Sequence, residues 1–218
     1  MEYNVASLFA GVGGICLGFQ NAQYKDKSYK LCFANEIDEY ACETYRTNFN
    51  HPLIQGDINK LLKPEICDNK EEKEYYESQR HILFDNKIDV LNGGFPCQAF
   101  SICGEMKGFE DKTRGTLFFD IARIIKEKQP QAFVLENVKN LASHDGGKTL
   151  QTILETLRDE LDYHVDYHLL NALDFGLPQK RERIIIVGSK KPFKMDWNFE
   201  IKNKKTLDDI LEKKVDPK

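Results

Sequence analysis

A cysteine at position 97 ends the run Gly93-Gly94-Phe95-Pro96-Cys97. The apolar residues 88–91 before it predict a buried strand, so the thiol is expected at the strand's carboxyl end, the edge at which open α/β sheets bind their ligands. The proline restricts the backbone, and the glycines let a substrate approach closely. We therefore predict that Cys97 is a nucleophile, although a cysteine taken alone is more often a small buried apolar residue.

Charged side chains follow or precede two other apolar runs. Glu136 follows residues 132–135, and it would share the sheet edge of Cys97 and act as a general acid if that run forms a neighbouring parallel strand. Arg181 and Arg183 precede residues 184–187, and in an extended segment they face one side. Planar guanidinium groups suit carbonyl oxygens and phosphates. A helix-capping acid and a solvated charged turn are the structural alternatives.

A glycine-rich turn, Phe9-Ala10-Gly11-Val12-Gly13-Gly14, separates the first expected strand from the first helix. A dinucleotide fingerprint would need its third glycine at the position of Cys16. Glu36 ends the second strand, where a carboxylate can bind ribose hydroxyls, and Asp57 ends the third, within reach of an adenine amino group. This pattern favours S-adenosylmethionine over a nicotinamide dinucleotide. A tight turn followed by two helix-capping acids is the structural alternative.

The elements that must position these residues alternate along the chain. Strands are expected over residues 5–9, 30–35, 53–55, 88–91, 132–135, 165–170 and 184–187, and helices over 15–23, 39–48, 117–128 and 149–161. Such alternation predicts an α/β fold with a mostly parallel sheet and helices on both faces. The charged segment 63–87 is expected to be a helical excursion without a chemical role, and residues 206–214 a short capped helix.

Composition narrows the class of protein. The 218 residues, 41% of them hydrophobic, suit one α/β domain, and no apolar run reaches the roughly 18 residues of a membrane span. The six cysteines form no Cys-x-x-Cys pair, so we expect no disulfide, no zinc or other metal, and a cytoplasmic location. The net charge of −4 argues against strong electrostatic binding of nucleic acid by this chain alone.

A thiol, a carboxylic acid, two guanidinium groups and an adenosyl cofactor together suit the methylation of a pyrimidine carbon. Addition of the thiolate to C6, with proton donation at N3, makes C5 nucleophilic. The polar stretch between Cys97 and residue 117 would then be a loop that carries cations over the substrate. An ordinary surface loop is the alternative.

The chain resembles bacterial DNA (cytosine-5)-methyltransferases of restriction–modification systems, over residues 3 to about 189. The resemblance is carried by an ordered set of motifs: Leu8-Phe9-Ala10-Gly11-Val12-Gly13-Gly14, Asn35-Glu36, Gly56-Asp57-Ile58, Gly94-Phe95-Pro96-Cys97-Gln98-Ala99-Phe100-Ser101, Arg114-Gly115-Thr116-Leu117-Phe118, Glu136-Asn137-Val138 and Gln179-x-Arg181-x-Arg183. It implies a Rossmann-like methyltransferase fold that uses S-adenosylmethionine and acts on double-stranded DNA.

The resemblance also implies roles for single residues. Cys97 attacks a flipped-out cytosine, Glu136 holds its amino group and protonates N3, Arg183 binds its carbonyl oxygen, and Arg181 supports the site and a nearby phosphate. The cofactor is surrounded by Phe9, Ala10, Gly11, Val12, Gly13, Gly14, Glu36, Ile37, Asp57, Ile58, Pro96 and Leu117. The loop that closes over DNA contains Gln98, Ser101, Lys107, Lys112 and Arg114. Ile37 departs from the larger aromatic residue that often covers the adenine.

Members of the family continue into a target-recognition domain. This sequence contains no such domain, so we expect a catalytic domain over residues 1–189 and a linker over 190–218. The chain is then either shortened or one half of a split enzyme whose second polypeptide carries the recognition domain, and alone it is expected to be inactive or weak. The alternatives are a transfer RNA methyltransferase of the same family, a nicotinamide-dependent oxidoreductase and a non-catalytic relative.

Overall fold

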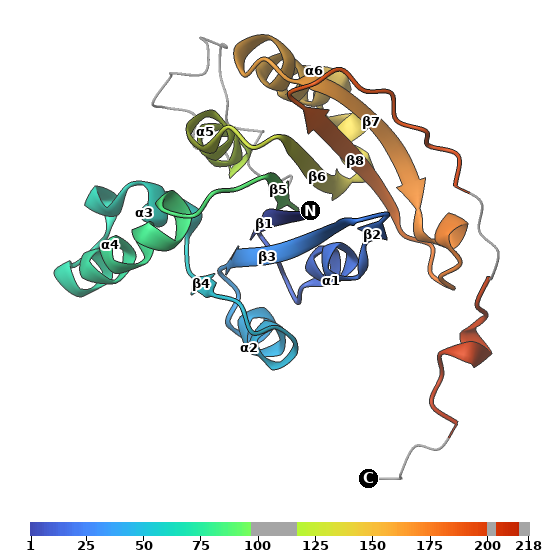
Figure 1. The fold of residues 1–218 in the computed structure, drawn as a ribbon, viewed down its shortest axis with the longest axis horizontal. Helices are drawn as coiled ribbons and strands as arrows, with labels where there is room; N and C mark the ends of the chain where they lie inside the picture. The colour runs from blue at the N-terminus through green and yellow to red at the C-terminus, as the bar shows by residue number, and fades with distance from the viewer. Residues whose placement is uncertain (97–116, 200–203, 214–218) are drawn as a thin grey trace.

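The computed structural model describes residues 1–96, 117–199 and 204–213, which form one α/β unit (Figure 1). Its strands are β1 (Glu2–Leu8), β2 (Gln23–Tyr24), β3 (Lys27–Glu36), β4 (Leu53–Gln55), β5 (Val90–Gly93), β6 (Ala132–Val138), β7 (His164–Asn171) and β8 (Glu182–Ser189). Its α-helices are α1 (Gly14–Asn21), α2 (Glu39–Asn48), α3 (Ile58–Leu62), α4 (Lys70–Phe84), α5 (Leu117–Lys128) and α6 (Lys148–Glu155). Short 3₁₀ turns connect several of them.

The described strands form a single sheet in the order β2-β3-β1-β5-β6-β8-β7, and β4 pairs with the end of β3. Four pairings are parallel, namely β1 with β3, β1 with β5, β3 with β4, and β5 with β6. The pairings of β2 with β3, β6 with β8, and β7 with β8 are antiparallel. The prediction of a mostly parallel sheet is therefore confirmed, with antiparallel strands at its two edges.

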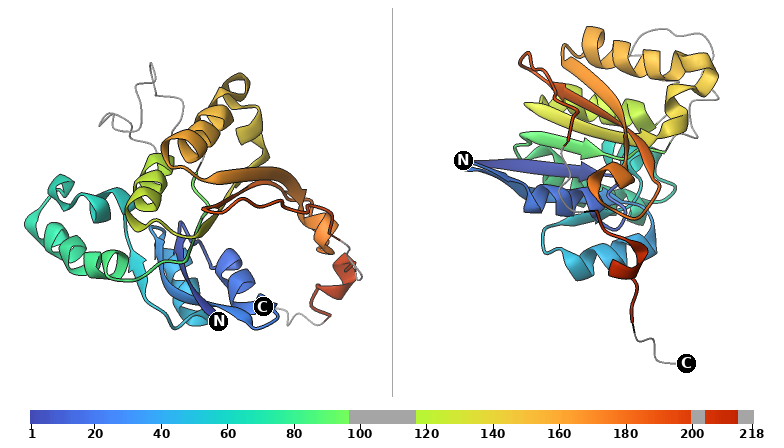
Figure 2. Two further views of the ribbon diagram at one scale, coloured as in Figure 1. Left: turned by 45° about the horizontal axis from the view of Figure 1, so that its top comes forward. Right: turned by 90° about the vertical axis from the view of Figure 1, so that its right-hand side faces the viewer.

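Helices cover both faces of the sheet, as predicted (Figures 1 and 2). Side chains on one face pack with α1 and α2 in a cluster that includes Val5, Leu31, Cys16 and Tyr45. The opposite face packs with α3 to α6 in a larger cluster. Alternation along β1 explains this division, because Val5 belongs to the first cluster, whereas its neighbour Ala6 belongs to the second.

Most predicted elements occur where the sequence places them. The bounds of α2, β4 and α5 are those predicted. The helix predicted over residues 149–161 is instead α6 followed by a π-helical turn, Thr156–Glu160. Residues 206–214 were predicted as a short helix, but the described part contains only a 3₁₀ turn, Leu207–Asp209, capped by Thr206 and Asp209. A three-residue turn suffices there because the capping box satisfies the free N–H groups.

The first part of the predicted linker lies against the sheet. The indole N–H of Trp197 donates to Asp166 Oδ2 at 2.8 Å, and its ring stacks on His168 with 5.4 Å between centroids. Both partners belong to β7, the edge strand. The division of the chain at residue 189 remains a prediction.

The glycine turn before α1 adopts a conformation that few residues tolerate. Gly13, the N-cap of α1, has φ of 96°, in the left-handed region. A Cβ atom at this position would lie 2.2 Å from the ring of Phe49, which follows α2. The turn is therefore held between two helices, and only glycine fits at position 13.

A buried acid lies in α5. Asp120 is 1% exposed, and its Oδ1 accepts from Arg123 Nη1 at 2.6 Å. Among the described residues, its Oδ2 has no hydrogen-bond partner. Burial raises the pKa of the Asp120 carboxyl to about 6, although Arg123 opposes the shift.

The first prediction compares two adjacent glycines. Gly13→Ala should lower the free energy of unfolding by about 1–3 kcal/mol, because the methyl group meets Phe49 and the positive φ disfavours alanine. Gly14→Ala is the control, since no atom lies within 4 Å of its added Cβ. Urea unfolding measures both. Equal stability of the two variants would contradict this packing.

The second prediction concerns pH. Because the pKa of Asp120 is higher in the folded state, its contribution to stability is full below about pH 4 and is lost as the pH rises through about 6. Between pH 5 and pH 7.5, the unfolding free energy of the parent should fall by about 1.4 kcal/mol relative to that of Asp120→Asn. Urea unfolding at both pH values checks this, with the exposed Asp159→Asn as control. Parallel pH profiles for the parent and Asp120→Asn would refute it.

Candidate cofactor and catalytic site

A cavity of about 260 Å³ lies at the carboxyl ends of β1, β3, β4 and β5. Open α/β sheets bind their ligands at this edge. Its lining residues come from the ends of these strands and the start of α5: Phe9, Asn35, Glu36, Ile37, Gly56, Asp57, Ile58, Gly94, Pro96 and Leu117. Seven of the predicted cofactor residues are among them, namely Phe9, Glu36, Ile37, Asp57, Ile58, Pro96 and Leu117.

Glu36 lines this cavity and binds the backbone of two segments beside it. Its Oε2 accepts from the N–H of Gly11 at 2.7 Å, and its Oε1 accepts from those of Ile37 and Asp38 at 2.8 and 2.9 Å. A carboxylate oxygen accepts about two hydrogen bonds, so Oε2 retains capacity for one donor from a ligand. The carboxylate thus joins the glycine turn to the end of β3.

The other predicted glycine-turn residues support the cavity from outside its lining. Ala10 N–H donates to Asn35 O at 3.0 Å, and Gly13 N–H donates to Ala10 O at 3.0 Å. Val12 is exposed, and Gly14 begins α1. Phe9 has φ of 54°, an unusual value for a residue other than glycine. The turn therefore contributes Phe9 to the cavity lining and the Gly11 N–H to Glu36.

Asp57 is held between β4 and α3. Its Oδ1 accepts from Asn59 N–H at 2.8 Å, so it caps α3, as the structural alternative for this acid expected. The same residue lines the cavity. Its own N–H donates to Tyr76 Oη at 2.7 Å. Tyr76 belongs to α4, within the segment predicted to have no chemical role, and no sequence motif indicated this contact.

The antiparallel pairing of β8 brings together three of the four predicted catalytic side chains, namely those of Glu136, Arg181 and Arg183. Because β8 runs against β6, its start lies at the edge where β5 and β6 end. Glu136 Oε1 accepts from Arg183 Nε at 2.8 Å, and Arg181 Nη2 lies 3.5 Å from the same oxygen. Glu136 Oε2 faces Gly94, since a Cβ built on that glycine would lie 3.5 Å from it. The Glu136 carboxylate therefore adjoins both the arginines and the cavity.

An asparagine next to Glu136 anchors the chain that leads to Cys97. Asn137 is 2% exposed, and its side-chain amide donates to Phe95 O at 2.8 Å. Its Oδ1 accepts from Val138 N–H at 2.8 Å. The sequence motif contains Asn137, but a role for it was not predicted. Its signal is an amide at the end of a buried strand, where backbone groups leave the sheet and need partners.

Several predicted residues lie outside the described part of the chain. These are Cys97, which was predicted as the nucleophile, and Gln98, Ser101, Lys107, Lys112 and Arg114 of the predicted DNA loop. Their roles remain predictions.

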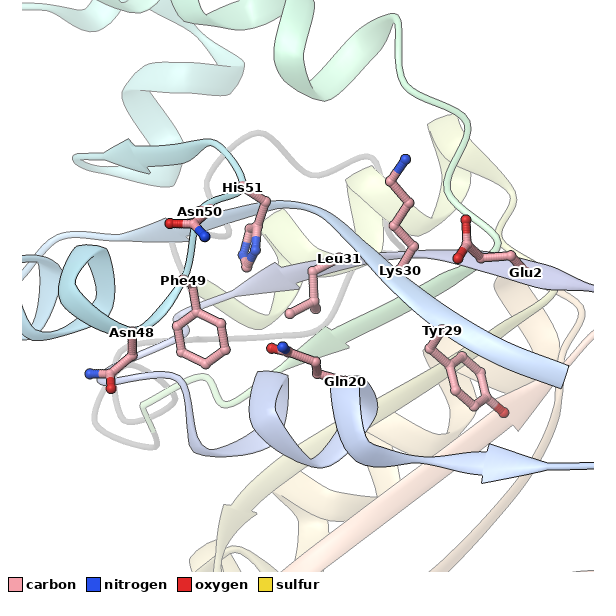
Figure 3. Close-up of a pocket in the computed structure, with 9 residues that line it drawn as sticks. All are labelled: Glu2, Gln20, Tyr29, Lys30, Leu31, Asn48, Phe49, Asn50 and His51. Atoms are coloured by element: carbon pink, nitrogen blue, oxygen red, sulfur yellow. The ribbon is translucent and has the colours of Figure 1, made fainter.

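Two other cavities, both lined by described residues, contain none of the predicted site residues. Figure 3 shows one of about 300 Å³, which is lined by Glu2, Gln20, Tyr29, Lys30, Leu31, Asn48, Phe49, Asn50 and His51. Glu2 begins β1, whereas Leu8 at the other end of β1 pairs with Asn35, the neighbour of Glu36. This cavity therefore lies toward the end of β1 that is remote from Glu36. A hollow of about 510 Å³ lies over β7 beside Trp197.

Two further findings apply to residues 1–96, 117–199 and 204–213. No group of three or more His, Cys, Asp or Glu side chains is arranged to hold a metal ion. No helix there is long and apolar enough to cross a membrane.

Sequence comparisons agree with the motifs. The profile of the family described as C-5 cytosine-specific DNA methylase matches residues 3–218. The type II methyltransferase M1.ScrFI of Lactococcus lactis subsp. cremoris is 47% identical over 222 residues, which cover 100% of this chain and 50% of that protein. M.HhaI of Haemophilus parahaemolyticus is 46% identical over 193 residues, which cover 88% of this chain and 50% of that protein.

Solved structures show the same architecture. A putative DNA modification methyltransferase from an Escherichia coli prophage superposes with a TM-score of 0.60 at 28% identity, over 86% of this chain and 47% of that one. A DNMT2 mutant from Spodoptera frugiperda gives 0.66 at 19% identity, over 98% and 61%. The second likeness concerns the fold alone.

The chain spans about half the length of the curated relatives that it matches. Within that half, the motifs, the Rossmann-like fold and the family profile coincide over nearly all of its residues. The chain belongs to the C-5 cytosine-specific DNA methylase family.

Proposed function

We propose that this chain is the cofactor-binding and catalytic lobe of a DNA (cytosine-5)-methyltransferase. Its substrates would be S-adenosylmethionine and a cytosine flipped out of duplex DNA in the bacterial cytoplasm. One juxtaposition carries the proposal: the cavity that contains Glu36 and Asp57 reaches Gly94, which faces the Glu136 carboxylate. A cofactor site and a proton donor therefore meet at one edge of the sheet.

The cavity suits an adenosyl group. Apolar side chains of Phe9, Ile58 and Leu117 offer surfaces for a purine ring, and carboxylates lie at the ends of two neighbouring strands. Oε2 of Glu36 has capacity for a ribose hydroxyl, and Asp57 is placed to accept from the purine amino group. When bound, S-adenosylmethionine would supply an activated methyl group to the nucleophilic carbon of the base.

The protein's own groups would prepare the base for this transfer. Addition of the Cys97 thiolate to C6 forms a sulfur–carbon bond, while Glu136 donates a proton to N3. The electron pair of the C5–C6 double bond thereby becomes available at C5. Arg183 would hold the carbonyl oxygen of the base. Methyl transfer would leave S-adenosylhomocysteine. A base would then remove the proton from C5, the bond from sulfur to C6 would break to release the Cys97 thiolate, and N3 would return its proton to Glu136.

The ion pair of Glu136 with Arg183 supports this assignment. The 2.8 Å contact occupies Oε1 and leaves Oε2 directed toward Gly94, beside the cavity. A carboxyl group held on one oxygen by a guanidinium has a fixed orientation for proton donation from the other. Arg181, half exposed and 3.5 Å from Oε1, would support the pair and reach a DNA phosphate.

Reading of the DNA sequence would need residues beyond these 218. The relatives are about twice as long, and the net charge here is −4, whereas DNA-binding surfaces are rich in cations. We infer that a region corresponding to the remainder of the relatives supplies target recognition and most phosphate contacts. That region would be joined to the same protein or carried by a second polypeptide.

Replacement of Glu36 tests the cofactor site. Glu36→Gln should raise the dissociation constant of S-adenosylhomocysteine by about tenfold or more, because an amide NH₂ would face backbone N–H donors and the acceptor for ribose would be lost. Isothermal titration calorimetry measures the constant. The exposed Glu39→Gln, three residues further on, is the control and should stay within about twofold. Unchanged binding by Glu36→Gln would refute the role of this carboxylate.

A covalent trap tests the chemistry. A duplex DNA with 5-fluorocytosine, incubated with the chain and S-adenosylmethionine, should form an adduct at Cys97, because C5 then carries no proton to remove and elimination fails. Mass spectrometry of the digested complex locates the adduct. Cys97→Ser should form none, and Glu136→Gln should form it about 100-fold more slowly.

Parallel reactions interpret the result of the trap. Transfer RNA with 5-fluorocytidine should give no adduct. If the chain is instead trapped preferentially by that RNA, the substrate would be transfer RNA and not DNA. If the chain alone is not trapped, addition of the second half of M1.ScrFI as a separate polypeptide should restore the adduct. An adduct on a residue other than Cys97 would contradict the proposed nucleophile.

A further inference from the structure

The turn at Gly56 and Asp57 is fixed from two sides. On the β3 side, Gly56 N–H donates to Glu36 O at 2.8 Å, and the Asn35 side-chain amide donates to Gly56 O at 2.9 Å. Gly56 has φ of 147°, a value that residues with a side chain rarely adopt. The backbone of the turn is thus bound to the same strand end that carries Glu36.

On the other side, the turn is held by Tyr76 of α4. The Asp57 N–H donates to Tyr76 Oη at 2.7 Å, and a Cβ on Gly56 would lie 2.4 Å from that oxygen. Tyr76 is 5% exposed. Burial raises the pKa of its hydroxyl, which therefore stays protonated and acts as a neutral acceptor near pH 7.

Helix α4 is itself anchored to the segment that follows Asp57. Lys60 of α3 makes ion pairs of 2.8 Å with Asp68 and Glu72, and Arg80 Nη1 donates to Leu62 O at 2.9 Å. These contacts fix the position of α4 relative to α3. The hydroxyl of Tyr76 therefore has a defined place against the turn.

The two oxygens of the Asp57 carboxylate differ in their hydrogen bonds to the described residues. Oδ1 accepts from Asn59 N–H, whereas Oδ2 accepts no hydrogen bond from the described residues. Asp57 and Ile58 both line the cavity. A shift of the turn would therefore move Oδ2 of Asp57 relative to any ligand in the cavity.

We propose that Tyr76 is a positioning residue that holds Asp57 so that its carboxylate recognises the amino group of a 6-aminopurine. The inference rests on the proposed function, and it assigns the purine selectivity of the cofactor site to a helix outside the family motifs. Tyr76 acts through the Asp57 backbone and does not itself line the cavity.

The test compares two ligands that differ at one purine substituent. Tyr76→Phe keeps the ring and removes the acceptor for Asp57 N–H. Its dissociation constant for S-adenosylhomocysteine should rise about five- to tenfold, whereas that for S-inosylhomocysteine, which has a carbonyl oxygen in place of the amino group, should change less than about twofold. Calorimetric titration measures both. In an Asp57→Ala background, Tyr76→Phe should cause no further loss of S-adenosylhomocysteine affinity.

Tyr163→Phe is the matched control. Tyr163 is a 3% exposed tyrosine whose Oη donates to Pro130 O at 2.7 Å, outside the cavity lining. The Tyr163→Phe variant should have a lower melting temperature than the parent, and its affinities for the two ligands should be unchanged. Equal losses of affinity for both ligands in Tyr76→Phe, or no loss for either, would overturn the positioning role of Tyr76. The proposed cofactor site would still stand in that case, provided that the parent protein binds S-adenosylhomocysteine. Failure of the parent to bind S-adenosylhomocysteine would overturn the proposed function and this inference with it.

Discussion

The direction of β8 is the constraint on which the site depends. A parallel strand beside β6 would begin at the far edge of the sheet, and the residues before it would lie a strand's length from Glu136. Because β8 is antiparallel, Val138 at the end of β6 lies opposite Arg183 at the start of β8. The ion pair of Arg183 with Glu136 follows from this register, as does the approach of Arg181.

The sequence predicted the fold class and most elements because their signals are local. Residues 39–48 begin after a capping aspartate, and residues 117–128 have a strong apolar face, so α2 and α5 have the predicted bounds. The direction of β8 could not be predicted from periodicity, because parallel and antiparallel strands have the same two-residue repeat. The π-helical turn after α6 likewise preserves an apolar spacing close to that of a helix.

The residues of the candidate site also fall into those that the sequence could predict and those that it could not. Glu36, Asp57 and Glu136 lie at or just beyond the carboxyl ends of β3, β4 and β6, so their type and position indicated chemistry. Tyr76 and Asn137 contribute through hydrogen bonds to backbone atoms far away in the sequence, with Asp57 and Phe95 as their partners. Such contacts depend on the tertiary packing of α4 and β6, and residue type alone does not reveal them.

The three backbone donors of Glu36 have a consequence for the kinetics of ligand exchange. The carboxylate is already oriented by Gly11, Ile37 and Asp38, so a ligand need not order the glycine turn when it arrives. Association with a preorganised site is limited by encounter and orientation, and differences in affinity between related ligands then arise mainly from how quickly each one leaves. The contacts that a bound molecule makes with this preorganised turn would therefore act mainly on its residence time.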